Sequence, residues 1–212
     1  MKELVVNKIM NNVSKYYNYD DVKLKEIKYG IESIYLTITK TIVVIIISLL
    51  LNTTKELMWF MLFYGLLRIT AFGLHAKKAW HCWVLLLTLF SLIPYLIKVL
   101  IINKYISLSL FIISTILFII YAPADTEKRP LIHKRKRIIY KIISIIISII
   151  YMTISRFTGS IISNSLLFAE LMQVIMILPI SYNLLGLKYD NYKSYRSKGG
   201  KKWNYLLLFQ HF

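Results

Sequence analysis

The sequence predicts an all-α integral membrane protein with six transmembrane helices and an N-terminal interfacial amphipathic helix. Of its 212 residues, 57% are hydrophobic and the mean hydropathy is +0.58, above the roughly even balance of soluble domains. The apolar residues gather in blocks of about 20, the length that crosses the roughly 30 Å hydrocarbon core of a bilayer. Connections rich in Lys and Arg alternate with weakly charged ones, as in multi-pass membrane proteins.

Residues 1–34 are predicted to lie at the membrane surface. Between residues 3 and 19, apolar side chains fall on one helical face, and Asn and Lys fill the other. This is the pattern of a helix in the plane of the membrane. Asp20 or Asp21 can cap a second helix. That helix starts with several lysines and then runs into the first span.

Six apolar blocks are predicted to form a membrane domain at residues 35–190. The predicted spans are 35–52, 56–73, 83–102, 105–122, 138–155 and 161–185. Asn103 and Lys104 make a tight turn between the third and fourth spans. Pro94 and Pro179 lie inside spans, where neighbouring groups can satisfy the carbonyls that a proline leaves free.

The basic residues predict the orientation of these spans. The net charge of +17 arises from 27 basic and 10 acidic residues. Nearly all Lys and Arg lie in the N-terminal arm, in residues 74–82, in residues 123–137 and in a basic tail at 191–212. Because Lys and Arg mark cytoplasmic loops, both termini and residues 74–82 are predicted to be cytoplasmic. The clusters lie beside spans, so we expect contacts with anionic lipid head groups and no nucleic-acid partner.

A polar island at residues 71–82, AFGLHAKKAWHC, holds the single cysteine and two of the four histidines. A thiol near imidazole and lysine side chains can be held as a thiolate, the nucleophilic form. On one continuous helix His75 and Cys82 would be about 10 Å apart along the axis. The spacing therefore predicts a break, with a turn at Gly73 and a new helix that starts near residues 76–79 and places Cys82 in an early turn.

Two other interpretations of the island stay open. Cys82 can be a small buried hydrophobic side chain while His75 caps a helix or faces head groups. A zinc site built from His75, His81, Cys82 and His133 is loosely spaced, so we predict neither a metal nor an organic cofactor. The single cysteine excludes an intramolecular disulfide.

Two motifs, RITAFGLHAKKAWHC and, two spans later, YAPADTEKRPL, resemble the accessory gene regulator protein B (AgrB) family. The resemblance extends from about residue 10 to 190. It implies a bacterial cell-membrane cysteine endopeptidase of quorum sensing that acts as a homodimer. Such an enzyme cleaves an AgrD-like propeptide through an acyl-enzyme and forms a cyclic thiolactone or lactone. By position, Cys82 corresponds to the nucleophile, His75 to its base, and Arg68 and Gly73 to two motif positions tied to activity.

Two charged residues in the spans need partners. Arg68 lies near the inner end of the second span, where it either contacts substrate, organises the site or snorkels to head groups. Glu170 lies about 14 Å into the last span and should face protein or water, with Gln173 nearby. We expect structural pairing of Glu170, with Arg68 or across a dimer, and keep a direct catalytic part as the alternative.

The basic loops are predicted to anchor the topology and to dock an acidic substrate tail. Pro123 and Pro130 should keep the second loop stiff and non-helical. The predicted substrate-binding residues are Lys77, Lys78, Lys128, Arg129, Lys134, Arg135, Lys136 and Arg137. The alternative function is a non-enzymatic peptide exporter or receptor sensor domain. Span interiors of mostly Ile, Leu and Phe argue against an exporter.

Overall fold

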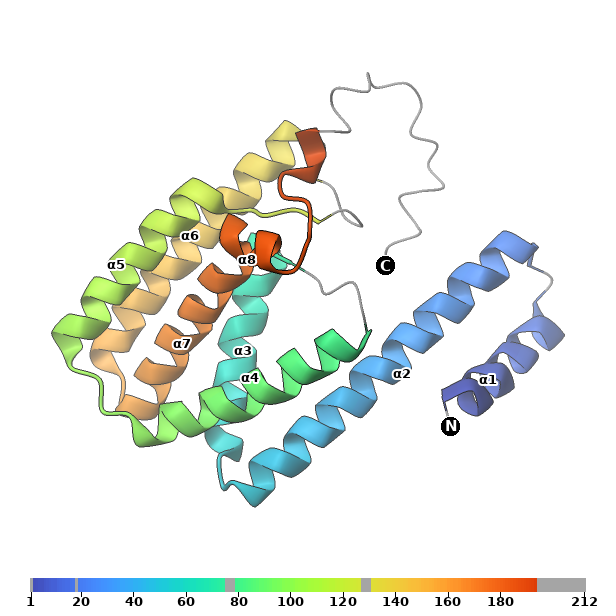
Figure 1. Ribbon diagram of the computed structural model, residues 1–212, viewed down its shortest axis with the longest axis horizontal. Coiled ribbons are helices and arrows are strands. Elements are labelled where there is room, and N and C mark those ends of the chain that lie inside the picture. Colours follow the sequence, from blue (N-terminus) through green and yellow to red (C-terminus); the bar gives the residue numbers. More distant parts are fainter. Residues whose placement is uncertain (1, 18, 75–78, 127–130, 194–212) are drawn as a thin grey trace. The chain divides into compact units, whose positions relative to one another are not determined.

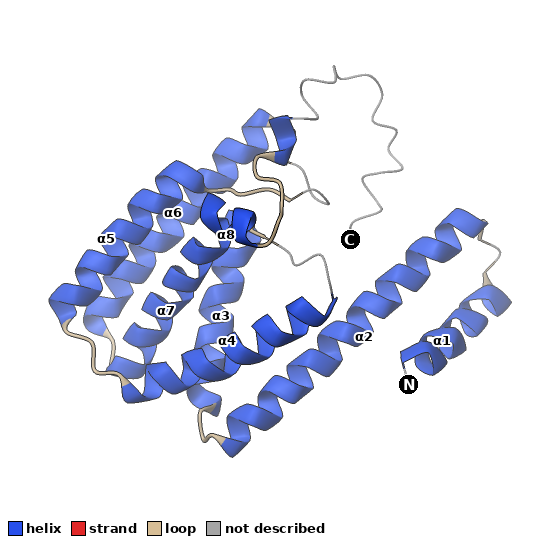
Figure 2. Ribbon diagram, viewed as in Figure 1, coloured by secondary structure: helices blue, strands red, loops and turns tan. Residues whose placement is uncertain are grey.

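The computed structural model describes residues 2–17, 19–74, 79–126 and 131–193. These residues form helices and no strands (Figure 2), which confirms the predicted all-α class. The helices are α1 (Lys2–Tyr16), α2 (Asp21–Leu50), α3 (Thr54–Ala71), α4 (Ala79–Val99), α5 (Lys104–Tyr121), α6 (Lys134–Phe157), α7 (Ser160–Ile177) and α8 (Pro179–Leu184).

The chain divides into two units. The first contains α1 and α2 up to Ile46, and the second begins at Ile47 and contains α3 to α8. Within the first unit, Lys2 Nζ pairs with Glu32 Oε2 at 3.0 Å and so links the two helices. The Asp20 carboxylate accepts a hydrogen bond from the Lys23 amide at 3.1 Å. Of the two predicted caps, Asp20 and Asp21, the structure therefore selects Asp20.

Four helical segments are long and apolar enough to cross a membrane. They are Lys23–Leu50, Lys104–Tyr121, Lys134–Phe157 and Ser160–Ile177. Helix α3 also has 18 residues, but it carries Lys55, Glu56 and Arg68 and is not among these four. In α4, Leu87–Val99 forms a shorter apolar stretch. The predicted number of six spans stays a prediction.

Helix α7 is the centre of the second unit (Figure 1). It packs against α3, α4, α5 and α6, and 56% of its apolar window is buried, against 22% in α5 and in α6. Ser165 and Ala169 are fully buried on α7, and small residues of this kind let membrane helices approach closely. The site described below lies at the C-terminal end of this helix.

Helix α6 turns its polar side chains inward. Its buried residues are Ser144, Ser148, Tyr151 and Ser155, while isoleucines such as Ile142, Ile146 and Ile149 are exposed. This is the reverse of a helix in a water-soluble protein. The pattern suits a helix in a membrane, where apolar side chains face the lipid and hydroxyl groups form hydrogen bonds to neighbouring helices.

The last predicted span is interrupted at its proline. Helix α7 ends at Ile177, Leu178 is extended with φ −66 and ψ 137, and Pro179 starts α8. The residue before a proline disfavours helical geometry, and proline suits the first helical position. The expectation that Pro179 lies inside a continuous span 161–185 is therefore wrong. Pro94 does lie within α4, as predicted.

Candidate active site

The polar island begins with a sharp turn after α3. Phe72 has φ 57 and Gly73 has φ 117. A Cβ on Gly73 would stand 2.5 Å from Arg68 Nη1 and 2.7 Å from the Met176 carbonyl oxygen. Backbone conformation and space both require glycine here. The predicted turn at Gly73 is confirmed.

The second half of the expected break is also present. Helix α4 begins at Ala79, and Cys82 is its fourth residue. Because α3 ends at Ala71, no single helix carries the whole island. The geometric condition for bringing residue 75 near residue 82 is thus met, while the contact between the two side chains stays a prediction.

Arg68 binds the backbone of this turn. Its guanidinium donates to the carbonyl oxygens of Phe72 at 2.8 Å, Gly73 at 3.3 Å and Leu74 at 2.6 Å. Carbonyl groups after a helix end lack helical partners, and a planar guanidinium can serve several of them at once. Arg68 therefore fixes the three residues that directly precede His75.

Helix α7 holds the same segment from another side. The Gln173 side-chain amide donates to the Phe72 carbonyl at 2.6 Å. The Leu74 amide donates to the Met176 carbonyl at 3.0 Å. Gln173 is fully buried, so its bond is shielded from water and its loss would leave the amide unsatisfied.

The two sequence motifs meet in a short parallel backbone pairing between Phe72 and Ala124. The Gly73 amide donates to the Ala124 carbonyl at 2.9 Å, and the Ala124 amide donates to the Ala71 carbonyl at 3.1 Å. The loop after α5 is therefore joined directly to the turn that leads to His75.

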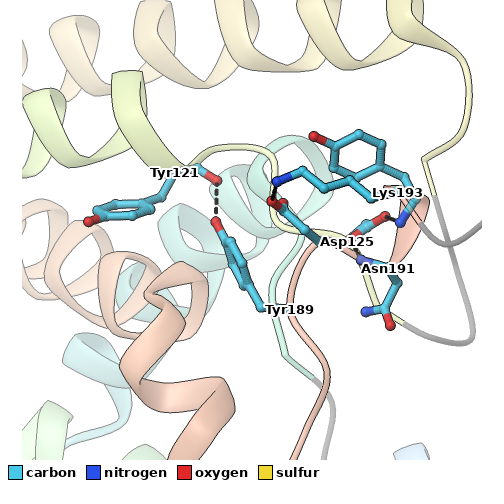
Figure 3. Close-up of polar contacts among 7 residues, drawn as sticks. Tyr121, Asp125, Tyr189, Asn191 and Lys193 are labelled. Carbon is cyan, nitrogen blue, oxygen red and sulfur yellow. Dashed lines mark hydrogen bonds and ion pairs between the residues drawn. The ribbon is translucent and has the colours of Figure 1, made fainter.

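Asp125 follows this pairing and is buried, with 3% of its surface exposed. Its carboxylate accepts from the amide of Asn191 at 3.0 Å (Figure 3). It also accepts from the amides of Tyr192 at 2.8 Å and Leu131 at 3.3 Å. Burial raises the pKa of Asp125, while these amides and the nearby charge of Arg137 act in the opposite direction. A buried carboxylate thus joins the loop after α5 to a distant part of the chain.

Glu170 lies deeper in the unit and is fully buried. Ser148 Oγ donates to its Oε1 at 2.5 Å, and Ser148 Oγ lies 2.7 Å from Thr115 Oγ1. This network joins α5, α6 and α7. Arg68 is not the partner of Glu170, because its guanidinium is bound to the carbonyls after α3. The expectation that Glu170 pairs with Arg68 of the same chain is therefore wrong.

An open cavity of about 250 Å³ lies beside the loop after α5. Its lining residues are Ala122, Pro123, Ile132, Lys134, Arg137, Ile138, Lys141 and Tyr192. The Arg137 guanidinium lies over the Tyr192 ring, 3.2 Å from its centroid, and Lys141 Nζ donates to the Ile119 carbonyl at 2.7 Å. The four basic residues predicted in the non-helical loop, Lys134 to Arg137, form the first turn of α6 instead. Lys134 and Arg137 line the cavity, whereas Arg135 and Lys136 are exposed and do not.

Residues 6–177 match the family model described as Accessory gene regulator B. The chain belongs to the AgrB family. It is similar to a putative AgrB-like protein of Clostridium acetobutylicum, with 34% identity covering 90% of this chain and 94% of the relative. A putative AgrB-like protein of Listeria welshimeri is 33% identical and covers 83% and 87% of the two chains. An accessory gene regulator protein B of Staphylococcus epidermidis is 30% identical and covers 84% and 93%.

No solved structure matches the chain. The AgrB match ends at Ile177, the last residue of α7. Both motif segments lie inside it, whereas α8 and residues 185–193 lie beyond its end. Family membership and four helices of spanning length together indicate a membrane protein.

The structure brings together some of the predicted AgrB site residues. Arg68 and Gly73 are in contact, and Cys82 lies in the first turn of the next helix. His75, Lys77, Lys78, Lys128 and Arg129 lie outside the described residues.

Sequence reasoning did not find the roles of Ala124, Asp125 and Tyr192. Ala124 and Asp125 belong to a motif that we had singled out, but no sequence pattern names backbone partners so far along the chain.

Proposed function

We propose that the chain is a membrane-embedded cysteine endopeptidase of an accessory gene regulator quorum-sensing system. It cleaves an AgrD-like propeptide and closes the product into a cyclic thiolactone or lactone. AgrB family membership supports this role. The proposed topology is six spans with both termini and the active site in the cytoplasm, an interfacial N-terminal helix, and a homodimeric assembly.

The observation that carries the proposal is the clamped turn before His75. Phe72, Gly73 and Leu74 are bound by Arg68, by α7 and by Ala124, so the chain enters the catalytic segment from a fixed position. Positioned groups of this kind lower the entropy cost of reaction. The N-terminus of α4 adds a partial positive charge that favours a thiolate at Cys82.

The reaction proceeds in two acyl transfers. His75 takes the proton of the Cys82 thiol, and the sulfur attacks the scissile peptide carbonyl. The C–N bond breaks, the leaving amine receives the proton from His75, and a thioester remains on Cys82. A thiol or hydroxyl of the peptide then attacks the thioester with His75 as base, closes the ring and releases Cys82.

Arg68, Gly73 and Glu170 support this chemistry without touching the reacting atoms. Three carbonyl oxygens already engage the Arg68 guanidinium, so its role is to hold the turn. Glu170 accepts from Ser148 and joins three helices, so its role is structural.

The basic residues dock an acidic part of the substrate and the anionic lipid surface. Lys134 and Arg137 line the cavity and present two cations beside apolar walls, which suits a carboxylate flanked by apolar groups. The remaining predicted substrate-binding residues add positive charge that attracts an acidic substrate. They are Lys77, Lys78, Lys128, Arg129, Arg135 and Lys136.

The test is co-expression with a candidate propeptide and detection of the cleaved, cyclic product by mass spectrometry. The wild-type chain should yield product, while Cys82→Ala and His75→Ala should yield none at equal membrane abundance. Cys82→Ser should be much weaker, because a serine hydroxyl is the poorer nucleophile. Processing that persists in Cys82→Ala would overturn the proposal and favour a peptide exporter or receptor sensor domain.

A further inference from the structure

We propose that Asp125 is a positioning residue that couples residues 188–193 to the turn before His75. It binds residues 188–193 to the loop after α5, and that loop in turn holds Gly73. The catalytic consequence rests on the proposed function, but the structural coupling does not.

The first part of the coupling is the carboxylate itself. Two of its three donors, the amides of Asn191 and Tyr192, belong to residues 188–193, and the third, Leu131, closes the loop after α5. The bond from Asn191 is buried and those from Tyr192 and Leu131 are partly buried, and a buried amide without an acceptor is costly. The Asp125 carboxylate therefore contributes directly to holding residues 188–193 on the loop.

Tyrosine hydroxyl groups strengthen the same junction. Tyr182 donates to the carbonyl oxygens of Asp125 at 3.1 Å and Ala124 at 3.4 Å. Tyr189 donates to the Tyr121 carbonyl at 3.5 Å (Figure 3). Lys193 pairs with Asp190 at 2.5 Å, which closes a turn whose Asp190 has φ 55. These bonds make residues 188–193 a folded part of the unit.

The second part of the coupling runs through Ala124, the neighbour of Asp125. Its amide and carbonyl bind Ala71 and Gly73. Gly73 has no space to move toward Arg68 or Met176, because even one added carbon would collide there. A displacement of Ala124 must therefore be followed by the turn rather than absorbed by it.

This coupling extends the site beyond the family match. The AgrB match ends at Ile177, yet residues 188–193 bind the loop that carries the second motif. Tyr192 also forms one wall of the cationic cavity. Residues 188–193 thus contribute to both parts of the proposed active site.

Amide hydrogen exchange of the full-length chain in detergent micelles tests the coupling. Asp125→Ala should speed exchange about 10-fold at Gly73 and Leu74 as well as at Asn191 and Tyr192, because local opening becomes easier. Asp125→Asn keeps one acceptor oxygen for amides that now use both carboxylate oxygens, so it should restore part of the protection. Asp190→Asn is the matched control: it removes the same charge and the ion pair with Lys193 but leaves every bond to Asp125 in place, so it should leave exchange at Gly73 unchanged.

A kinetic measurement tests the positioning role. Asp125→Ala should lower the single-turnover rate of peptide cleavage about 10- to 100-fold, the cost of a displaced reactive group. Peptide affinity, measured for Cys82→Ala/Asp125→Ala against Cys82→Ala, should fall less than the cleavage rate, since only the Tyr192 wall of the cavity is released and its cations stay in place. Asp125→Asn should recover part of the rate.

Unchanged exchange at Gly73 and Leu74 in Asp125→Ala would overturn the coupling. An unchanged cleavage rate would overturn the positioning role. Processing that survives Cys82→Ala would defeat the proposed function but leave the exchange result decisive. If Asp125→Ala does not give folded protein, Tyr182→Phe removes two bonds of the same junction without loss of bulk. Faster exchange at Gly73 then supports the coupling, and unchanged exchange overturns it.

Discussion

The guanidinium of Arg68 lies so close to Gly73 that a single added Cβ would stand 2.5 Å from Nη1. The two residues form one unit: the glycine makes room for the arginine, and the arginine binds the carbonyls that the glycine turn exposes. A change in either residue should therefore disturb the same three backbone groups.

Gly73→Ala should abolish processing and destabilise the chain. An alanine at φ 117 is strained and collides with Arg68 and Met176, which together cost on the order of 1–3 kcal/mol. Thermal unfolding in detergent and product formation measure the two effects. Gly65→Ala is the control within α3: a Cβ there meets nothing within 4 Å, and alanine favours a helix, so stability should hold or rise. Equal losses in both variants would contradict the role of the turn.

Arg68→Lys should lose most activity although it keeps the positive charge. An ammonium is a compact donor and cannot serve three successive carbonyls in the plane of a guanidinium. The matched substitution is Arg156→Lys, because Arg156 donates to one carbonyl, that of Lys104, at 3.0 Å. Product yield from co-expressed peptide should fall in the first variant and stay near wild type in the second. Full activity of Arg68→Lys would show that charge alone is required.

Glu170→Gln should keep both fold and activity, because a side-chain amide oxygen can still accept from Ser148. Glu170→Ala should lower the free energy of unfolding by about 2–4 kcal/mol, since it opens a cavity and leaves the serine hydroxyl without its acceptor. Chemical unfolding and peptide cleavage should be measured together. An inactive but stable Glu170→Gln would reveal a catalytic carboxyl group.

The cavity predicts a difference between two pairs of basic residues on one helical turn. Lys134→Gln/Arg137→Gln should weaken binding of an acidic peptide about 10-fold at low salt, whereas Arg135→Gln/Lys136→Gln should have a much smaller effect. Both double variants lose two charges, and only the first pair lines the cavity. Affinities are measured in the Cys82→Ala chain at several salt concentrations. Salt screens the long-range attraction by positive charge, so the series separates that attraction from contacts within the cavity. Equal losses of affinity in the two double variants would mean that the peptide is attracted by the overall positive charge and not by the cavity.

Because Asp125 is buried, the stability that it contributes should fall as the pH rises, the reverse of a carboxylate whose pKa is lowered by folding. Its folded-state pKa is raised, so the stability it contributes is fully present below the unfolded pKa, about 3.9, and is lost as the pH rises through the folded pKa. Mild acid should therefore not release residues 188–193 through this group. Exchange protection at Asn191, corrected for intrinsic rates, should be at least as high near pH 5 as near pH 7 for the wild type, whereas Asp125→Asn should show no such change. Loss of protection in acid would contradict this.

The break in the polar island could be predicted because its causes are local. Helix geometry rules out contact across seven regular residues, and a glycine supplies the turn. Pro179 was misread because the apolar run continues past it, so hydropathy hides the helix end that the backbone of Leu178 requires. That a segment is helical was therefore easier to predict than the residue at which the helix ends.

The partners of buried polar groups could not be predicted. Arg68 binds backbone carbonyls, and Asp125 binds backbone amides; every residue carries such groups, so the sequence does not mark them. Glu170 was expected to need a partner, but the choice of Ser148 depends on how α6 packs against α7. These contacts follow from tertiary structure rather than from pattern.

The pairing of Ala124 with the turn has an electrostatic consequence. Helices α3, α5 and α7 end at Ala71, Tyr121 and Ile177, and the bonds among the residues around these ends bring the three carboxyl termini to one place. Each carries roughly half a negative charge from its aligned peptide dipoles. The Arg68 guanidinium donates to the carbonyls that follow the end of α3, so its positive charge offsets part of this convergence of negative helix ends.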